Sequence, residues 1–294
     1  MKSGKILRAM TRDGSARAIV TDATGIVERA RKLHGLSVMS TIVLGRALTG
    51  ASMIGSLLQE KQESITLCIN GDGEAGKTLV VSDYFGNVRG YLENPLLPLK
   101  LTEAGKPDVG GTIGAGFLSI AHETGNGEPQ TGTVPLRSGE IAEDIAAYYA
   151  ESEQIPTICS LGIIPAEDGS VRAAGGVLIQ LLPFPNEDTV AALESNAAVY
   201  GRVTDMLLKG KSLTEVMAAI MGNLPYDLFD EITTDYLCTC SRERMFLGIR
   251  SLGQNQIREL LNEEEKAGHG RTLTAHCRFC ETEYRFDEAE LTAK

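Results

Sequence analysis

The sequence contains no tryptophan, and aromatic residues make up only 5% of its 294 residues. It also lacks an excess of positive charge, because 28 lysines and arginines stand against 39 aspartates and glutamates, a formal net charge of −11. Nucleic-acid-binding proteins meet phosphates with clustered positive charge, so this balance argues against DNA and RNA as partners. Apolar residues at 43% and charged residues at 23% are ordinary for a globular protein and exclude a disordered chain.

Targeting and membrane signals are missing as well. Residues 1–10 (MKSGKILRAM) have neither the apolar core nor the small-residue cleavage site of a secretory signal. The nearest candidate for a membrane helix, residues 47–58, is shorter than the ~18 apolar residues that such a helix needs, and it carries Thr, Gly and Ser. We therefore expect a cytoplasmic protein with no membrane partner.

Residues suited to nucleophilic catalysis are scarce. The histidines are His34, His122, His269 and His276, and none stands in a recognisable Ser/His/Asp or Cys/His motif. We expect His34 and His122 at turns or strand ends, and His269 and His276 in solvated loops rather than as metal ligands. The carboxylates are numerous but scattered. The sequence therefore predicts a protein that is not an enzyme.

The first 182 residues predict an N-terminal α+β domain. Residues 5–22 read as a hairpin around Asp13-Gly14-Ser15, followed by a helix near 24–33 and a long, mostly buried helix over 37–58. Five strand-like runs separated by glycine-containing turns then fill residues 63–135. A helix over 140–151 and two further strands complete this domain.

Residues 183–232 predict a metastable helical linker. Pro183 and Pro185 mark its start, because neither has the backbone donor that a helix or strand interior requires. Two stripes of apolar residues follow at helical spacing: Val190, Leu193 and Ala197, then Leu213, Val216, Met217, Ile220 and Met221 behind a Ser212…Glu215 capping box. Isolated helices shorter than about 12 residues are marginal in water, so we expect this segment to depend on docking against another part of the chain.

Four of the six cysteines form two tight pairs, Cys238-Thr239-Cys240 and Cys277-Arg278-Phe279-Cys280. Four thiolates at about 2.3 Å complete a closed, structural zinc shell, and a small tail with few large apolar residues needs such a staple. We predict a C-terminal domain over 233–294 that binds one zinc ion through all four. Cys68 and Cys159 instead alternate with apolar neighbours, the pattern of small buried hydrophobic residues.

Residues 71–78 (GDGEAGKT) form a second candidate motif, because they match a nucleotide-binding P-loop. In a P-loop, however, a helix begins at the Lys and Thr, whereas Lys77 and Thr78 precede β-branched residues and an early turn. Asp72 and Glu74 would also repel phosphates. A glycine-rich hairpin turn is favoured, with two alternatives kept open: a P-loop protein with a structural zinc ribbon, and a zinc-dependent protein-interaction module.

Several stretches together resemble the redox-regulated 33 kDa chaperonins, a family of bacterial zinc-switch heat-shock holdases. The stretches are Cys238-x-Cys240 with Ser241-Arg242-Glu243-Arg244, Cys277-x-x-Cys280, Leu33-His34-Gly35, Leu44-Gly45-Arg46, Ser138-Gly139-Glu140, Tyr148-Tyr149, Ser152-Glu153-Gln154, Ala173-Ala174-Gly175-Gly176 and Ile179-Gln180-Leu181-Leu182-Pro183. The resemblance covers essentially the full length of the chain.

The resemblance implies a chaperone that hydrolyses no ATP and is idle when reduced and zinc-bound. Oxidation would form the disulfides Cys238–Cys240 and Cys277–Cys280, release zinc and unfold the C-terminal region. The implied partners are unfolded client proteins, a second copy in an active homodimer, and reductants of the thioredoxin or glutaredoxin type. The residues by themselves do not decide whether disulfides form within the two cysteine pairs or across them.

The energetics of zinc binding agree with such a switch. A structural zinc ion contributes roughly 10–16 kcal/mol to folding, against roughly 5–15 kcal/mol for the total stability of a typical domain. Its loss is therefore expected to unfold the tail, so that the linker helices lose any partner that they have there and expose apolar side chains. These are Leu207, Leu208, Val216, Met217, Ile220 and Met221. We expect clients to bind this surface, and a groove on the N-terminal domain is the rival site.

Overall fold

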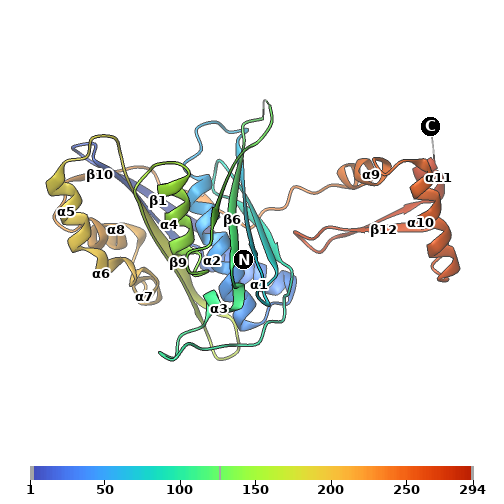
Figure 1. Ribbon diagram of the computed structural model, residues 1–294, viewed down its shortest axis with the longest axis horizontal. Coiled ribbons are helices and arrows are strands. Elements are labelled where there is room, and N and C mark those ends of the chain that lie inside the picture. Colours follow the sequence, from blue (N-terminus) through green and yellow to red (C-terminus); the bar gives the residue numbers. More distant parts are fainter. Residues whose placement is uncertain (1–2, 126, 293–294) are drawn as a thin grey trace. The chain divides into compact units, whose positions relative to one another are not determined.

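The computed structural model describes residues 3–125 and 127–292, and the chain divides into two compact units, Met1–Leu237 and Cys238–Lys294. Figure 1 follows the chain through both units, each of which combines helices with β-strands. This arrangement confirms the α+β fold class. The finer division of the first unit at residue 182, with a metastable segment over 183–232, concerns its unfolding and stays a prediction.

The larger sheet of the first unit is antiparallel and has the strand order β10-β1-β2-β9-β8, with β11 also paired to β1. Its strands are β1 (Gly4–Thr11), β2 (Ala16–Asp22), β8 (Thr157–Pro165), β9 (Val171–Leu181), β10 (Tyr226–Leu228) and β11 (Ile232–Thr234). The predicted hairpin over 5–22 is confirmed, since β1 and β2 pair around the turn at Gly14, whose φ of 74° suits glycine. Residues 226–234 thus return to the strand that opens the chain.

The second sheet of this unit has the order β5-β4-β3-β6-β7 and is also antiparallel. Its strands are β3 (Ser64–Gly71), β4 (Lys77–Asp83), β5 (Val88–Leu92), β6 (Gly116–Glu123) and β7 (Gln130–Pro135). One face of β3 is buried, with Ile65, Leu67 and Ile69 pointing into the core, while the intervening residues are half-exposed. The strand-like runs predicted over 63–135 are confirmed.

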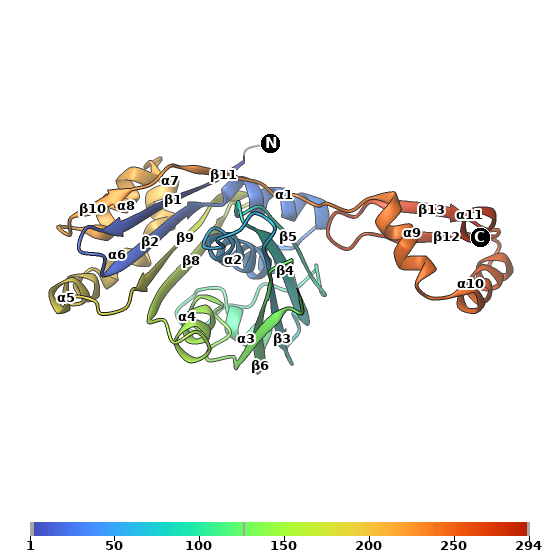
Figure 2. The same ribbon diagram turned by 90° about the horizontal axis from the view of Figure 1, so that it is seen from above.

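Helix α2 (Val38–Gly55) lies between the two sheets, as Figure 2 shows. All of its residues except Val38 and Arg46 are buried, which confirms the long buried helix predicted over 37–58. By length and composition α2 could also cross a membrane, but 89% of it is buried inside the protein, as expected of a core helix. Three further helices border this core: α1 (Thr24–His34), α3 (Val109–Ile113) and α4 (Ala142–Glu151).

Four short helices cover the opposite face of the larger sheet (Figure 1). They are α5 (Glu187–Ser195), α6 (Ala197–Tyr200), α7 (Val203–Leu208) and α8 (Leu213–Met221). Helix α8 begins with the predicted capping box of Ser212 and Glu215. Its apolar stripe is buried against sheet residues such as Val20 and Val177. The sheet is therefore a docking partner of these helices, which confirms the expectation that they depend on another part of the chain.

The second unit contains α9 (Arg242–Arg250), α10 (Gln254–Lys266), α11 (Glu288–Thr292) and the hairpin of β12 (Thr272–His276) with β13 (Glu283–Asp287). Its buried apolar cluster is small and consists of Ile257, Leu261, Leu273, Phe286 and Leu291. A core of this size provides little folding free energy, because small domains bury too little apolar surface to offset the loss of chain entropy.

Candidate metal centre

The second unit brings its four cysteines to one place by two local structures. Cys277 and Cys280 lie in the loop between the paired strands β12 and β13. Cys238 and Cys240 lie just before α9, whose N-cap, Ser241, accepts a hydrogen bond from the backbone N–H of Arg244. The cap fixes where the helix starts, so the Cys-x-Cys segment ends directly at a rigid element.

The four sulfur atoms lie within 4.8 Å of one another. Cys238 Sγ is 3.7 Å from Cys277 Sγ, and Cys240 Sγ is 3.2 Å from Cys280 Sγ. Zinc–sulfur bonds of about 2.3 Å in a tetrahedron place sulfurs roughly 3.8 Å apart, whereas a disulfide needs about 2.05 Å. All six cysteines are free thiols. The cluster thus has the spacing of a tetrahedral metal site in its reduced form.

The loop that carries Cys277 and Cys280 is shaped by its own backbone. The N–H groups of Cys280 and Glu281 donate to the carbonyl of Cys277 at 3.2 and 2.8 Å, and the N–H of Cys277 donates to the carbonyl of Thr282 at 3.0 Å. Glu281 has a left-handed φ of 56°, which lets the chain turn back into β13. This hydrogen-bonded turn positions both sulfurs without help from distant contacts.

The pKa values of the clustered thiols indicate that ionising all four cysteines requires a compensating positive charge. Burial raises the pKa of Cys238 and of Cys277 above the ordinary value for a thiol. Burial also opposes ionisation of Cys280, but hydrogen bonds from Thr282 and Cys240 outweigh it and lower the pKa of Cys280 to about 7. Four thiolates so close together repel one another, and a bound cation offsets that repulsion. The donor set therefore fits a soft divalent metal such as zinc.

Two hydroxyl groups stand next to the sulfurs. The Tyr284 hydroxyl lies 3.1 Å from Cys240 Sγ, and the Thr282 hydroxyl lies 3.2 Å from Cys280 Sγ. Groups of this kind orient metal-binding sulfurs and tune their basicity. Neither residue was identified from the sequence, where a Thr and a Tyr shortly after Cys280 carry no distinctive pattern.

The histidines are not part of the four-sulfur group, although His276, which was expected in a loop, is the last residue of β12 and directly precedes Cys277. His269 and His276 pair with Glu264 and Glu281, at 2.8 and 3.2 Å. His34, the last residue of α1, has its Nε2 2.9 Å from the Tyr236 hydroxyl. His122, near the end of β6, faces Glu63 at 3.6 Å. Among the residues that the structure describes, no histidine is in a group placed to hold a metal.

The two remaining cysteines are half-buried rather than fully buried, so the expectation for them was only partly right. Cys159 packs against the main core, and burial of its sulfur raises its pKa to about 12. Burial also raises the pKa of Cys68. Neither thiol readily forms the thiolate that reacts with oxidants.

The P-loop-like stretch is a β-hairpin. Strands β3 and β4 are paired up to Asn70 and Lys77, and Thr78 continues β4 rather than opening a helix. The glycines allow a close approach by α3: a Cβ on Gly71 would lie 2.0 Å from the carbonyl oxygen of Ile113. The favoured interpretation of residues 71–78, a glycine-rich hairpin, is confirmed.

A buried anchor precedes the cluster in the first unit. Tyr236 is 1% exposed, and its hydroxyl donates to the Gly90 carbonyl at 2.7 Å. The backbone beside it pairs with β5, since Val88 donates to the carbonyl of Asp235 and accepts from Leu237, at 2.9 and 2.8 Å. Asp235 also pairs with Arg29 at 3.1 Å. The chain is thus fixed to the sheet up to the residue before Cys238.

Comparison with known proteins places these features in a family. The family model described as Hsp33 protein matches residues 4–287. The chain belongs to the Hsp33 family. The "33 kDa chaperonin" of Acetivibrio thermocellus is 40% identical over 286 residues, covering 97% of this chain and 95% of that protein. The "33 kDa chaperonin" of Geobacter sulfurreducens is 39% identical over 287 residues, covering 97% and 93%.

A solved structure agrees with this assignment. The crystal structure of the 33 kDa chaperonin (heat shock protein 33 homologue) from Thermotoga maritima has a TM-score of 0.88 and 33% sequence identity, and the match covers 99% of this chain and 97% of that one. Membership of the Hsp33 family makes this protein a chaperone associated with the stress response. Its four-cysteine cluster suits both metal binding and redox chemistry.

Proposed function

We propose that this protein is a redox-regulated, ATP-independent holdase. In the reduced state Cys238, Cys240, Cys277 and Cys280 would hold one zinc ion, and in the oxidised state the protein would bind unfolding clients in the cytoplasm without acting as an enzyme. The observation that carries the proposal is the convergence of four free sulfurs within 4.8 Å, in a unit whose own apolar core is small. Folding of this unit therefore depends on the state of its sulfurs.

When bound, zinc would supply a closed tetrahedral link between four thiolates. The cysteines themselves tie two segments together: Cys238 and Cys240 hold the start of α9, while Cys277 and Cys280 hold the loop of the β12–β13 hairpin. The remaining apolar contacts of the unit come from a few residues on α10, α11 and the hairpin. Loss of the sulfur link is expected to unfold the unit.

The proposed oxidation takes place within each pair, Cys238 with Cys240 and Cys277 with Cys280. Each pair of zinc-bound thiolates loses two electrons to one hydrogen peroxide molecule, which takes up two protons from the solvent and becomes two water molecules, and the zinc ion is released once both pairs are oxidised. A disulfide across the pairs, such as Cys238–Cys277, would close a long loop and keep the unit compact. Disulfides within the pairs close only short rings, so they leave the two segments free to separate. A Cys-x-Cys ring is also strained, which suits reversal by thioredoxin- or glutaredoxin-type reductants.

The chain itself offers a route from the cysteines to the helical layer. Upstream of Cys238 come Tyr236, then β11 and β10, both paired with β1, and then α8. These paired segments are only three residues long, so each adds little stability alone. Once the second unit unfolds, the anchor at residues 235–237 and these short strands are expected to loosen in turn, and α8 follows.

Release of α5–α8 would expose apolar surface on both partners of the interface. The helices carry Val216, Met217, Ile220 and Met221, all fully buried in the docked state. The sheet beneath them carries Leu7, Ala9, Ala18, Val20, Val177 and Ile179. A contiguous apolar patch of this kind binds unfolded chains, and it would also favour association of two oxidised copies into the proposed homodimer.

The test is light scattering from a thermally aggregating client, with a zinc-sensitive dye present and peptide mapping of the disulfides afterwards. We expect aggregation to be suppressed only after peroxide treatment, in step with zinc release. The C68S/C159S double variant is the matched control and should behave like the parent. Oxidation that leaves aggregation unchanged, or disulfides found across the pairs, would contradict this mechanism.

A further inference from the structure

Strand β8 is the last strand of the larger sheet, and in the part of the chain that the structure describes it pairs with β9 alone. The N–H of Leu181 donates to the carbonyl of Pro156, and Thr157 is paired with Gln180. In an antiparallel ladder this bond means that Ile158, Ser160 and Gly162 exchange hydrogen bonds with β9. The N–H and C=O groups of Thr157, Cys159, Leu161 and Ile163 therefore point away from the sheet. Within residues 3–125 and 127–292, these outward groups have no backbone partner.

Strand β8 also lacks the features that protect other edges in this protein. It is nine residues long, and its sequence TICSLGIIP contains no charged residue. The edge strand β5 is covered by residues 235–237, whereas β7 is shorter and largely polar. Natural proteins shield edge strands with charges, prolines or short length, because a bare apolar edge recruits other strands. Along the strand itself, protection of this kind is confined to its end, where Pro165 follows an irregularity in the pairing with β9. Helix α4 packs against the core side of β8.

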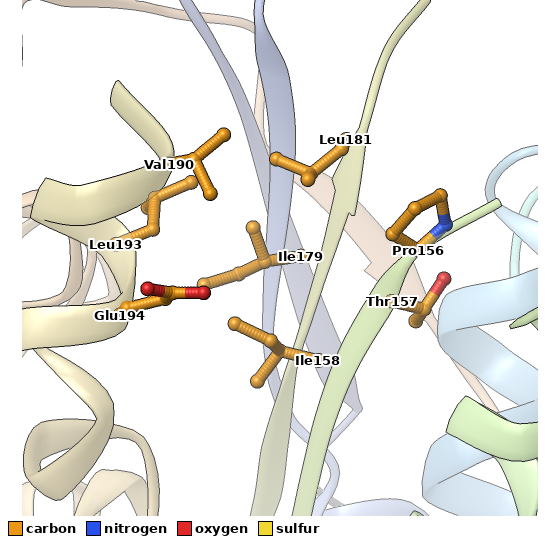
Figure 3. Close-up of a pocket in the computed structure, with 8 residues that line it drawn as sticks. All are labelled: Pro156, Thr157, Ile158, Ile179, Leu181, Val190, Leu193 and Glu194. Atoms are coloured by element: carbon orange, nitrogen blue, oxygen red, sulfur yellow. The ribbon is translucent and has the colours of Figure 1, made fainter. Parts of the chain in front are cut away.

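An apolar cavity adjoins the beginning of this edge. Figure 3 shows Ile158, Ile179 and Leu181 pointing from the two strands toward Val190 and Leu193 of α5. The cavity volume is about 170 Å³. A dry apolar cavity of roughly 150 Å³ holds a benzene molecule, so this one has room for a branched or aromatic side chain. Further along β8 the same face is closed, since a Cβ on Gly162 would lie 2.1 Å from Thr204 Oγ1 of α7.

We propose that β8 is a docking edge for an extended, uncharged segment of a client protein. Backbone groups of that segment would pair with the outward groups of Thr157, Cys159, Leu161 and Ile163, and one of its apolar side chains would enter the cavity beside Ile158. In strand addition of this kind, backbone bonds supply affinity and a side-chain pocket supplies selectivity. An edge without charges, next to an apolar cavity, matches a client segment that is itself uncharged and apolar. The inference rests on the proposed holdase function and assigns it a substrate class and a binding mode.

The position of the cavity links this edge to the redox state. Its outer wall is α5, one of the helices proposed to leave the sheet after oxidation. In the reduced protein the edge accepts one strand and one side chain. After α5 departs, Ile179 and Leu181 become part of a wider apolar floor that continues from the same edge. Peptide binding at β8 is therefore expected in both redox states and is tighter in the oxidised one.

The decisive test is residue-resolved hydrogen exchange with a short, end-blocked peptide of alternating valine and threonine. In the free protein, the amides of Thr157, Cys159, Leu161 and Ile163 should exchange fast, while those of Ile158, Ser160 and Gly162 should be protected. Added peptide should slow the first set and leave the second unchanged. Protection that appears elsewhere without this alternation would overturn the assignment.

A charge at the cavity provides the matching substitution. I158K should weaken peptide binding at least tenfold, because the long lysine side chain, paired with Glu194 of the cavity lining, would occupy the space that the peptide side chain needs. T131K adds the same charge on the exposed edge strand β7 and should bind the peptide like the parent. Thermal melting of the reduced variants shows whether each remains folded, and Ile158→Ala offers a neutral second variant that enlarges the cavity. Equal peptide affinity in I158K, Ile158→Ala and the parent would contradict the proposal.

The remaining outcomes separate this inference from the holdase function. If the oxidised protein suppresses aggregation but β8 shows no alternating protection, the edge is not the client site and the holdase function stands. If peptide binds β8 with alternating protection but oxidation never produces holding activity, the edge site stands and the redox mechanism fails. Alternating protection that grows with protein concentration in the absence of peptide would show pairing between two copies, which overturns the client assignment.

Discussion

Tyr236 is the residue whose position most directly connects the two parts of the proposed switch. It is buried in the first unit, yet only one residue separates it from Cys238. Its hydroxyl lies between the Gly90 backbone and His34 Nε2, at 2.7 and 2.9 Å. A tyrosine in this position resists movement of the chain that an unfolded second unit would otherwise allow.

We expect Tyr236→Phe to accelerate activation by peroxide. Loss of the hydroxyl leaves the buried Gly90 carbonyl without that donor, which typically costs about 1–3 kcal/mol. The measurement is the rate at which client holding appears after oxidation, with zinc release recorded in parallel. Tyr84→Phe serves as the control, because the half-exposed Tyr84 is in a surface turn. If both variants activate at the parental rate, residues 235–237 do not restrain the switch.

Asp13 fixes α5 to the turn between β1 and β2, and this contact should depend on pH. Its carboxylate accepts hydrogen bonds from Ser15 and from Thr189 of α5, both at 2.7 Å. Hydrogen bonds from Thr11, Thr189 and Ser15 hold the pKa of Asp13 well below its usual range. Because the folded-state pKa is lowered, the stabilisation is present above the unfolded-state pKa of about 4 and is lost as the pH falls through the folded-state value.

Limited proteolysis of residues 183–232 in the reduced protein measures this contact. At neutral pH, Asp13→Asn should be cleaved several-fold faster than the parent, and the difference should shrink as the pH falls below about 4. Asp168→Asn is a matched control, because Asp168 makes a similar turn with Ser170 but lies between β8 and β9. Faster cleavage of Asp168→Asn as well would point to general destabilisation instead of a loss specific to α5.

At the scale of elements, we expect the helical layer to respond first to weakened packing because its helices are short. Helix α8 provides a direct test. Ile220 is fully buried against the sheet, whereas Ala218 on the same helix is exposed. Ile220→Ser should cost about 2–5 kcal/mol of docking free energy through the cavity and the buried hydroxyl. The reduced variant should then suppress client aggregation without peroxide, while Ala218→Ser should remain idle. An Ile220→Ser protein that is stable and idle when reduced would show that α8 does not cover the client surface.

Comparison of individual elements shows what the sequence could predict. The capping box at Ser212 and the P-loop-like hairpin were predicted correctly because local chemistry decides both: which residue caps a helix, and whether a helix can follow Thr78. The surface against which α8 packs was not predicted, because the periodicity of a sequence identifies an apolar helix face without identifying what covers it. Anchoring by Tyr236 and the open edge at β8 depend on pairings between residues far apart in the sequence, which leave no local pattern.

The same distinction between local chemistry and tertiary placement applies to the candidate metal centre. The spacing of the paired cysteines identifies them in the sequence, and the structure brings all four predicted ligands together. The hydroxyls of Tyr284 and Thr282, which adjust two of the sulfurs, reach them only through the turn geometry of the β12–β13 loop. The sequence therefore predicted which cysteines come together, while their role as zinc ligands stays a prediction. It did not identify groups whose position depends on the turn around them.

At the scale of the whole molecule, the two units differ sharply in what holds them together. The first unit has two sheets around a buried 18-residue helix, and its main apolar cluster spans both sheets. The second unit has one small apolar cluster and brings its four cysteines together. Apolar burial in this protein is thus uneven, and the four cysteines lie in the unit where the least of it supports the fold.

Metal removal should therefore unfold the units separately. In calorimetry of the reduced, zinc-loaded protein we expect two transitions, and a chelator should abolish the smaller one because structural zinc supplies most of the folding free energy of a domain this small. The larger transition should persist at a somewhat lower temperature, reflecting the first unit without its downstream restraint. A C277S/C280S variant, which lacks half of the sulfurs, should reproduce the chelated profile without any chelator, whereas C68S should keep both transitions. If the smaller transition survives both the chelator and C277S/C280S, the apolar cluster around Phe286 is sufficient to fold the second unit, and oxidation of the cysteines could not act by unfolding it.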